Sequence, residues 1–189
     1  IICVTYQDVE PYVSENIPLI SLDRHFHKKV SCISSDNYHG GELAAQKMIS
    51  TGSRHLLYLR NGSEISGETL KRGKGFKSYC DAHGVYCETL NLGDDFDLVR
   101  GKASVEDVLR NFIISARKTG KMRYDGIYTS TDLLAKALLE QLQFLGVEVP
   151  EEVQLVGHDG MQWMNSGKYL VSTIVQPVPD MARKAVELL

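Results

Sequence analysis

Residues 125–157, DGIYTSTDLLAKALLEQLQFLGVEVPEEVQLVG, contain the pattern that decides the fold class. A short apolar run opens the stretch, a helical pattern occupies 133–145, and a second apolar run closes it. Thr131 or Asp132 can cap the N-terminus of the helix, and Gly146 can end it. Two strands that are joined through a helix run parallel in one sheet. The stretch therefore predicts one β-α-β unit of a parallel sheet.

The same alternation extends outward to both ends of the chain. We expect further strands at 18–23, 30–34, 55–59, 88–92 and 172–175. We expect further helices at 38–50, 71–83 and 101–118, and a last one that opens with Pro177 and Pro179. Asp36 or Asn37 can cap the helix that starts at 38, and a polar loop is expected over 60–69. This order of elements indicates an α/β protein with parallel sheets that are covered on both faces.

The composition is that of an ordinary globular protein. The chain has 189 residues, of which 43% are hydrophobic and 24% charged, and its formal net charge is -3. This length can bury a core as one large domain or as two small lobes. No stretch reaches the roughly 18 apolar residues of a membrane helix, so we expect no membrane contact. Segments that bind nucleic acid are usually basic, so we do not expect this segment to bind DNA by itself.

No complete catalytic motif is present. The glycines of Gly73-Lys-Gly75 fall inside a predicted helix, where a dinucleotide fingerprint would need a strand-to-helix turn. The stretch 62–67 has neither the spacing of a nucleophile elbow nor that of a phosphate-binding loop. The histidines form no H-E-x-x-H pair. We therefore predict that the chain is not an enzyme and uses no cofactor.

The four cysteines, Cys3, Cys32, Cys80 and Cys87, are best explained as reduced thiols of an intracellular protein. Cys80, His83 and Cys87 form a local cluster that imitates a metal site. The cluster offers three ligands with no obvious fourth, whereas structural zinc normally requires four. We predict no metal site.

Polar residues follow nearly every predicted strand. They are Asp23-Arg24, Ser34-Ser35-Asp36, Arg60-Asn61, 93–96, Ser130-Thr131-Asp132, His158-Asp159 and Gln176. Open parallel sheets bind their ligands at the carboxyl ends of the strands. So many polar groups at one edge favour a binder of polar ligands, or an enzyme, over a structural protein.

Seven segments, in one consistent order, resemble the lactose/galactose repressor family of transcription regulators. They are IPLISLDR at 17–24, VSCISSDNYHGG at 30–41, STGSRH at 50–55, RGKGF at 72–76, STD at 130–132, VPEEVQLVGHD at 149–159, and TIVQP at 173–177 with the helical pattern that follows. Together they cover nearly the whole chain.

The resemblance implies a type I periplasmic-binding-protein-like fold with two Rossmann-like lobes and parallel sheets. The N-terminal lobe would be incomplete and would consist of residues 1–35 and 177–189. The C-terminal lobe would consist of residues 36–176. The ligand would lie between the two lobes, which agrees with the polar strand ends.

The resemblance also implies ligand contacts at eight positions: Arg72, Asp159, Phe96, Asp23, Arg24, Thr131, Gln176 and Glu68. Arg72 would hold hydroxyls or carboxylates through its guanidinium, and a surface salt bridge is the alternative. Asp159 would accept two sugar hydroxyls. Phe96 would stack on the ligand or pack in the core, and its loop is one residue longer than usual.

The remaining positions carry alternatives of their own. Thr131 stands where many members have Asn, and Asp132 is expected to cap a helix instead of touching the ligand. His158 replaces the usual aromatic residue of its motif. A hinge role competes with ligand contact at Gln176. Glu68, in the predicted loop, is either a ligand contact or a mobile surface acid.

The function that the resemblance implies is that of a ligand-sensing domain. The chain would be a piece of a cytoplasmic repressor that binds a small polar effector, a sugar above all, and acts as a homodimer. Operator DNA would be bound through an N-terminal helix-turn-helix outside this sequence. A purine, a phosphosugar or a phosphoprotein partner stays open as the effector. A periplasmic sugar-binding protein is the alternative function, and a sugar-handling enzyme is the third.

Overall fold

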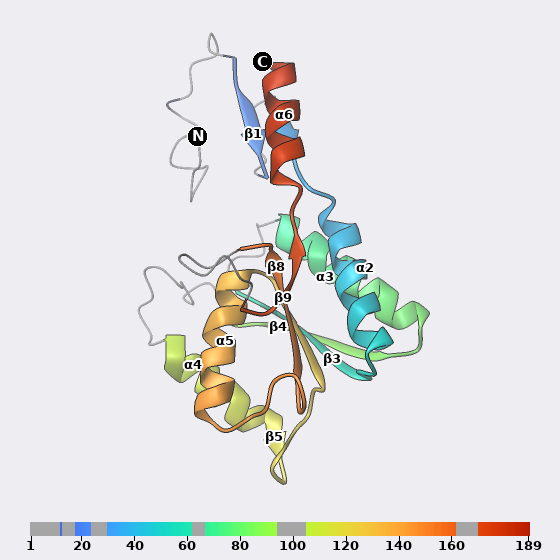
Figure 1. The fold of residues 1–189 in the computed structure, drawn as a ribbon, viewed down its shortest axis with the longest axis vertical. Helices are drawn as coiled ribbons and strands as arrows, with labels where there is room; N and C mark the ends of the chain where they lie inside the picture. The colour runs from blue at the N-terminus through green and yellow to red at the C-terminus, as the bar shows by residue number, and fades with distance from the viewer. Residues whose placement is uncertain (1–11, 13–17, 24–29, 62–66, 94–104, 162–169) are drawn as a thin grey trace. The chain divides into compact units, whose positions relative to one another are not determined.

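The computed structural model describes residues 12, 18–23, 30–61, 67–93, 105–161 and 170–189. These residues divide into two compact units, which are described separately. The first unit draws its residues from 1–36 and 176–189, and the second from 37–175. Figure 1 shows the chain passing twice between the two units, before α2 and after β9.

The first unit combines two short strands and one helix. β1 (Ile20–Leu22) and β2 (Ser31–Ile33) pair in parallel. The helix is α6 (Val178–Leu188), which packs against both strands. Pro177 occupies the position before its first residue, where a missing backbone N–H costs no helical hydrogen bond. The side chain of Met181 is the one that α6 buries.

The second unit is built on a parallel sheet of five strands in the order β4-β3-β7-β8-β9. The bounds are His55–Arg60 for β3, Tyr86–Asn91 for β4, Gly126–Thr129 for β7, Gln154–Asp159 for β8 and Ser172–Val175 for β9. Every pairing between neighbours is parallel, so the strands end at a common carboxyl edge. The predicted α/β fold with parallel sheets is confirmed.

Helices cover both faces of this sheet (Figure 1). α2 (Asn37–Ser50) and α3 (Gly67–Ala82) lie on one face, and α4 (Val105–Ala116) and α5 (Asp132–Phe144) lie on the other. The side chains of β3 pack on both faces in turn, because successive side chains of a strand point to opposite sides. Leu57 and Leu59 pack with α4 and α5, whereas Leu56 and Tyr58 pack with α2 and α3.

Glycines let α2 and α3 approach each other closely. A Cβ on Gly41 would lie 2.0 Å from the backbone oxygen of Arg72, and one on Gly75 would lie 1.9 Å from that of Tyr38. Neither separation is sterically possible, so only glycine fits at these two places. This contact brings Arg72 of α3 to the first turn of α2, which matters for the site below.

Two predicted boundaries are wrong. The helix predicted over 101–118 begins, in the described residues, at Val105 and ends at Ala116. The next residues form a small antiparallel hairpin, in which β5 (Arg117–Lys118) pairs with β6 (Lys121–Met122). Its turn holds Thr119 at φ 51° and Gly120 at φ 84°, and positive φ at both positions is typical of tight hairpins.

The second boundary concerns the loop predicted over 60–69. Arg60 is the last residue of β3, and α3 already begins at Gly67. The polar composition of this region hid the first turn of the helix, because that turn buries charged groups instead of apolar ones. Among the described helices, none combines the length and the apolar character that crossing a membrane would require.

Candidate functional site

The carboxyl edge of the five-stranded sheet carries the polar groups of the second unit. Arg60 ends β3, Ser130 follows β7, and His158 and Asp159 end β8. The first turns of α3 and α5 lie at the same edge and add Glu68 and Asp132. All of them except Asp159 are less than a tenth exposed. Buried polar groups require partners, so their contacts define the geometry of this edge.

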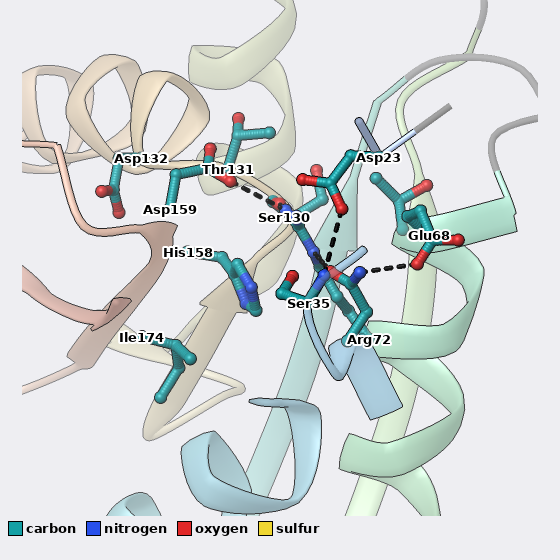
Figure 2. Close-up of polar contacts among 12 residues, drawn as sticks. Asp23, Ser35, Glu68, Arg72, Ser130, Thr131, Asp132, His158, Asp159 and Ile174 are labelled. Atoms are coloured by element: carbon teal, nitrogen blue, oxygen red, sulfur yellow. Dashed lines mark hydrogen bonds and ion pairs between the residues drawn. The ribbon is translucent and has the colours of Figure 1, made fainter. Parts of the chain in front are cut away.

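Arg72 is the centre of this arrangement (Figure 2). Its Nε donates to Oδ1 of Asn37 at 2.7 Å, and its Nη1 donates to the backbone oxygen of Ser130 at 2.5 Å. The same Nη1 lies 3.2 Å from Oδ1 of Asp159. The Arg72 side chain is only 6% exposed, so the alternative of a surface salt bridge is wrong. A guanidinium held on several sides has a fixed orientation.

Asp159 is the more open partner of this ion pair. Its side chain is 27% exposed, against 6% for Arg72, so solvent or a ligand reaches the carboxylate first. Its backbone has φ 119°, a conformation that non-glycine residues rarely adopt. Such strain persists only where the surroundings enforce it, and it concentrates at functional sites. The strained backbone and the ion pair with Arg72 together fix the position of the Asp159 carboxylate.

Glu68 extends the network on the other side of Arg72. Its Oε2 accepts from Nδ2 of Asn37 at 2.6 Å, and its Oε1 lies 2.9 Å from Nζ of Lys71. Glu68 is 7% exposed and sits in the first turn of α3, so the interpretation as a mobile surface acid in a loop is wrong. Within the described residues, the contacts run continuously from Lys71 through Glu68, Asn37 and Arg72 to Asp159.

Thr131 and Asp132 divide two roles between them. The Thr131 side chain accepts from the backbone N–H of Leu134 at 3.2 Å, which makes Thr131 the cap of α5. The expectation that Asp132 is the cap is wrong. Asp132 accepts instead from the backbone N–H of Met161 at 2.6 Å and from Oγ1 of Thr173 at 2.7 Å. It thereby ties α5 to the segment after Asp159 and to β9. Burial raises the pKa of the Asp132 carboxyl.

His158 precedes Asp159 at the end of β8 and is buried. Its Nδ1 shares a hydrogen bond of 2.6 Å with the Tyr128 hydroxyl, and its ring is 2% exposed. Burial, and then the nearby Arg72 charge, lower the pKa of His158 to about 3. The imidazole is therefore neutral at ordinary pH. Tyr128 also packs against Tyr58 and Phe76. His158, which stands where the family has an aromatic residue, therefore adds its ring to a cluster of aromatic rings.

Two other predicted positions belong to the first unit. Asp23 follows β1, and its Oδ1 accepts from the backbone N–H of Ser35 at 3.3 Å (Figure 2). It also has a positive φ, of 53°. Gln176 directly follows β9, and its backbone oxygen accepts from the N–H of Val178. Phe96 and Arg24 lie outside the described residues, so their predicted roles stay predictions.

Asn37 and Ser130 were missed as parts of the network. Asn37 was expected only as a possible helix cap, yet its amide group bridges Glu68 and Arg72. The sequence signal was present, because a polar residue follows β2 just as others follow β3, β7 and β8. Ser130 was among the polar residues predicted at the strand ends, but it contributes its backbone oxygen. Every residue has such an oxygen, so the residue type gives no signal for this contact.

The arrangement suits binding better than catalysis. A carboxylate on a fixed guanidinium offers acceptors and donors in the geometry that hydroxyl groups can use. Within the described parts of the chain, no group of three or more His, Cys, Asp or Glu residues could hold a metal ion. Cys80, His83 and Cys87 accordingly form no such group.

Comparison with known proteins gives a consistent picture. The model of the periplasmic binding protein-like domain matches residues 45–189. A sucrose operon repressor of Streptococcus mutans is 25% identical over 96% of this chain, and a ribose operon repressor of Bacillus subtilis is 29% identical over 100% of it. The matched regions are 52% and 54% of those relatives, so the chain spans about half of their length.

A solved structure adds to these relatives. It is a periplasmic binding protein/LacI transcriptional regulator from Alkaliphilus metalliredigens in complex with D-xylulofuranose. The two chains superpose with a TM-score of 0.71 and are 28% identical, over 95% of this chain and 63% of the other. The two operon repressors are regulators and not enzymes, in agreement with the prediction that this chain is not an enzyme.

Proposed function

Because this chain belongs to the family of periplasmic binding protein-like domains, as a ligand-binding domain of the LacI type, we propose that it senses a sugar effector for a transcriptional repressor. The observation that carries the proposal is the ion pair between Arg72 and Asp159 at the carboxyl edge of the sheet. Sugar hydroxyls need donors and acceptors side by side, and this pair supplies both.

The proposed effector contacts are assigned to each unit separately. Arg72, Asp159 and Thr131 would contact the effector from the second unit, with Phe96 stacking on it. Asp23, Arg24 and Gln176 would contact it from the first unit. Glu68 would act by holding Asn37 and, through it, the orientation of Arg72. The first unit would correspond to part of the N-terminal lobe and the second to the C-terminal lobe.

The regulatory step would use a part of the protein outside this sequence. The relatives are operon repressors about twice as long as the matched region, which supports a separate DNA-binding segment. Such regulators bind two half-sites as dimers, and they work in the cytoplasm, where the operator is. Effector binding would change operator affinity only through different affinities for two conformations, a coupling worth typically about 1–3 kcal/mol.

The test is a thermal-unfolding screen of the intact protein. The panel contains sucrose, D-ribose, D-xylulose, sugar phosphates, nucleobases and amino acids. A ligand at about 100 times its Kd adds about 2.7 kcal/mol to the free energy of unfolding. We expect at least one sugar or sugar phosphate to stabilise the protein in this way. Stabilisation by an amino acid or a nucleobase alone would contradict a sugar effector.

Variants then test the site itself. Asp159→Asn and Arg72→Lys should weaken the binding of that sugar by at least about tenfold, or 1.4 kcal/mol. Lys77→Ala is the matched control, since Lys77 lies on the same helix and is an exposed residue that pairs with exposed Asp81. Its affinity should equal that of the unchanged protein. If all three variants bind the sugar with equal affinity, the carboxyl edge of the sheet is not part of the effector site.

A further inference from the structure

His158 has one ring nitrogen that the packing of the sheet does not use. The residue precedes Asp159 at the end of β8, and Figure 2 shows its ring below the Asp159 side chain. Two residues earlier on the same strand, Val156 belongs to the core cluster under α2 and α3. Alternation along the strand therefore places the His158 ring on that face of the sheet.

The packing around the ring fixes its orientation. Nδ1 shares a hydrogen bond of 2.6 Å with the Tyr128 hydroxyl, and Ile174 is the register partner of His158 on β9. A Cβ on Gly40, near the start of α2, would lie 2.8 Å from Cε1 of the ring. The ring thus fills the space that a side chain at position 40 would need, and the direction of Nε2 is set.

Nε2 of His158 is the ring nitrogen left over. It has no hydrogen-bond partner among the described residues, although His158 is only 2% exposed. Even so, Nε2 is not one of the described side-chain atoms that are sealed from solvent without a partner, so an opening reaches it. Because His158 is the penultimate residue of β8, that opening lies at the carboxyl edge, with Arg72 and Asp159.

The Tyr128 hydroxyl decides which ring nitrogen carries the proton. Tyr128 is completely buried, and within the described residues Nδ1 of His158 is the partner of its hydroxyl. A buried O–H requires an acceptor, so the hydroxyl donates and Nδ1 accepts. Burial lowers the pKa of His158 to about 3, which keeps the imidazole neutral. A neutral imidazole has one proton, so Nε2 carries it and is a donor.

We propose that Nε2–H of His158 donates a hydrogen bond to an oxygen of the effector and so selects among sugars. The inference rests on the proposed function and adds a contact to the eight positions that the family resemblance implies. A sugar with an oxygen in the right place satisfies the donor. A sugar without that oxygen leaves a buried N–H unpaired, and sites built in this way reject such analogues strongly.

Two substitutions in the intact protein separate the two ring nitrogens. His158→Asn keeps an amide within reach of the Tyr128 hydroxyl but has no group at the place of Nε2. His158→Gln extends its amide to the place of Nε2 and gives up the Tyr128 contact. We expect His158→Asn to weaken binding of the sugar found in the screen by about tenfold, and His158→Gln by no more than about threefold. A role in packing alone gives the opposite order, which would overturn the proposal.

Analogues of that sugar then identify the accepting oxygen. The panel contains each monodeoxy and deoxyfluoro form of the sugar. The unchanged protein should bind one deoxy form about tenfold more weakly than the sugar, whereas His158→Asn should bind the two equally. His83→Asn is the matched control, since His83 is an exposed histidine just after the C-terminal end of α3. It should retain the preference of the unchanged protein.

Nuclear magnetic resonance of the unchanged protein gives a test that needs no variant. The ¹⁵N shifts of His158 should show Nδ1 unprotonated and Nε2 protonated, and the Nε2–H resonance should move when the sugar is added. The reverse tautomer, or a resonance that the sugar leaves in place because only water accepts from Nε2–H, overturns the proposal.

The two failures can be told apart. If no sugar binds the unchanged protein, the proposed function fails and this inference falls with it. If a sugar binds but His158→Asn keeps the full preference among its analogues, the inference about His158 alone is overturned and the effector site stands.

Discussion

The two faces of the five-stranded sheet are built from different chemistry. The face under α4 and α5 is a mainly aliphatic core with Leu109, Ile113, Leu134 and Leu138, joined by Phe112 and Tyr124. The face under α2 and α3 holds Tyr58, Tyr128, Phe76 and Cys80, with close-packed glycines. At its carboxyl end this second face passes into buried Glu68, Arg72 and Asn37. The buried core of the first face therefore supplies stability, whereas the second face also holds Arg72 and Glu68 of the proposed effector site.

The largest expected effect tests the aliphatic face. Leu138→Ala should lower the free energy of unfolding by roughly 2–5 kcal/mol, because it leaves a cavity in a fully buried cluster. Chemical denaturation measures this loss. Effector affinity in the folded protein should not change, because Leu138 packs on the opposite face from Arg72. A change in affinity beyond a few-fold would show that the two faces are coupled.

The second prediction tests the close contact of α2 and α3. Gly75→Ala should cost about 1–3 kcal/mol, because its Cβ would meet the backbone oxygen of Tyr38. Unlike Leu138→Ala, it should also weaken effector binding by displacing α3 and Arg72. Gly67→Ala is the matched control, since open space surrounds its Cβ, and it should stay within about 0.5 kcal/mol of the unchanged protein. Equal effects of the two variants would refute the steric explanation.

The third prediction concerns the neutral His158. Its folded pKa of about 3 lies below the ordinary value of 6.5, so the unfolded chain binds a proton that the folded chain does not. Protonation of the unfolded chain therefore lowers the free energy of unfolding as the pH falls below 6.5. The stability that neutral His158 permits is fully present above pH 6.5 and is lost as the pH falls toward 3. Between pH 6.5 and 5.5 the loss should be about 1 kcal/mol, measured by denaturation at each pH.

His158→Asn is the reference for that measurement, because its amide can meet the Tyr128 hydroxyl but does not titrate. The difference between the two proteins should shrink as the pH falls. The raised pKa of Asp132 acts in the opposite direction, but it is common to both proteins and cancels in the difference. Parallel pH profiles would mean that His158 becomes protonated in the folded protein.

The smallest expected effect concerns Thr131, the cap of α5. Thr131→Ala should cost about 1 kcal/mol, because the N–H of Leu134 loses its acceptor. Thr131→Asn should stay within about 0.5 kcal/mol of the unchanged protein, because Asn caps helices as well as Thr does. If Thr131 also contacts the effector, Thr131→Asn should shift the preference among the sugars of the screen. Unchanged preference would limit Thr131 to its capping role.

Much of the fold was predictable because its signals are local. The alternation of apolar strands and amphipathic helices, and glycines such as Gly146, needed only neighbouring residues. The errors arose where local composition misled. Polar residues before Lys71 concealed the first turn of α3, and the apolar run after Val105 gave no sign of the hairpin at 117–122.

The candidate site was predictable only in outline. Strand ends and family resemblance selected Arg72 and Asp159 as ligand contacts, and this role stays a proposal. Neither could show that Arg72 is buried between Asn37 and Ser130, because those partners lie 35 and 58 residues away in sequence. Asp132 was assigned to a cap for the same reason, since its partner Thr173 is 41 residues distant.

The sequence by itself determined the alternation of strands and helices and the family. It also predicted the carboxyl edge as the place for polar ligands, and this role stays a proposal. Only the tertiary structure decided which charges are buried and which of them are paired. The physical reason is that periodicity and capping depend on bonds within a few residues. Burial and pairing depend on the approach of α2 to α3, where two backbones touch because Gly41 and Gly75 have no side chains.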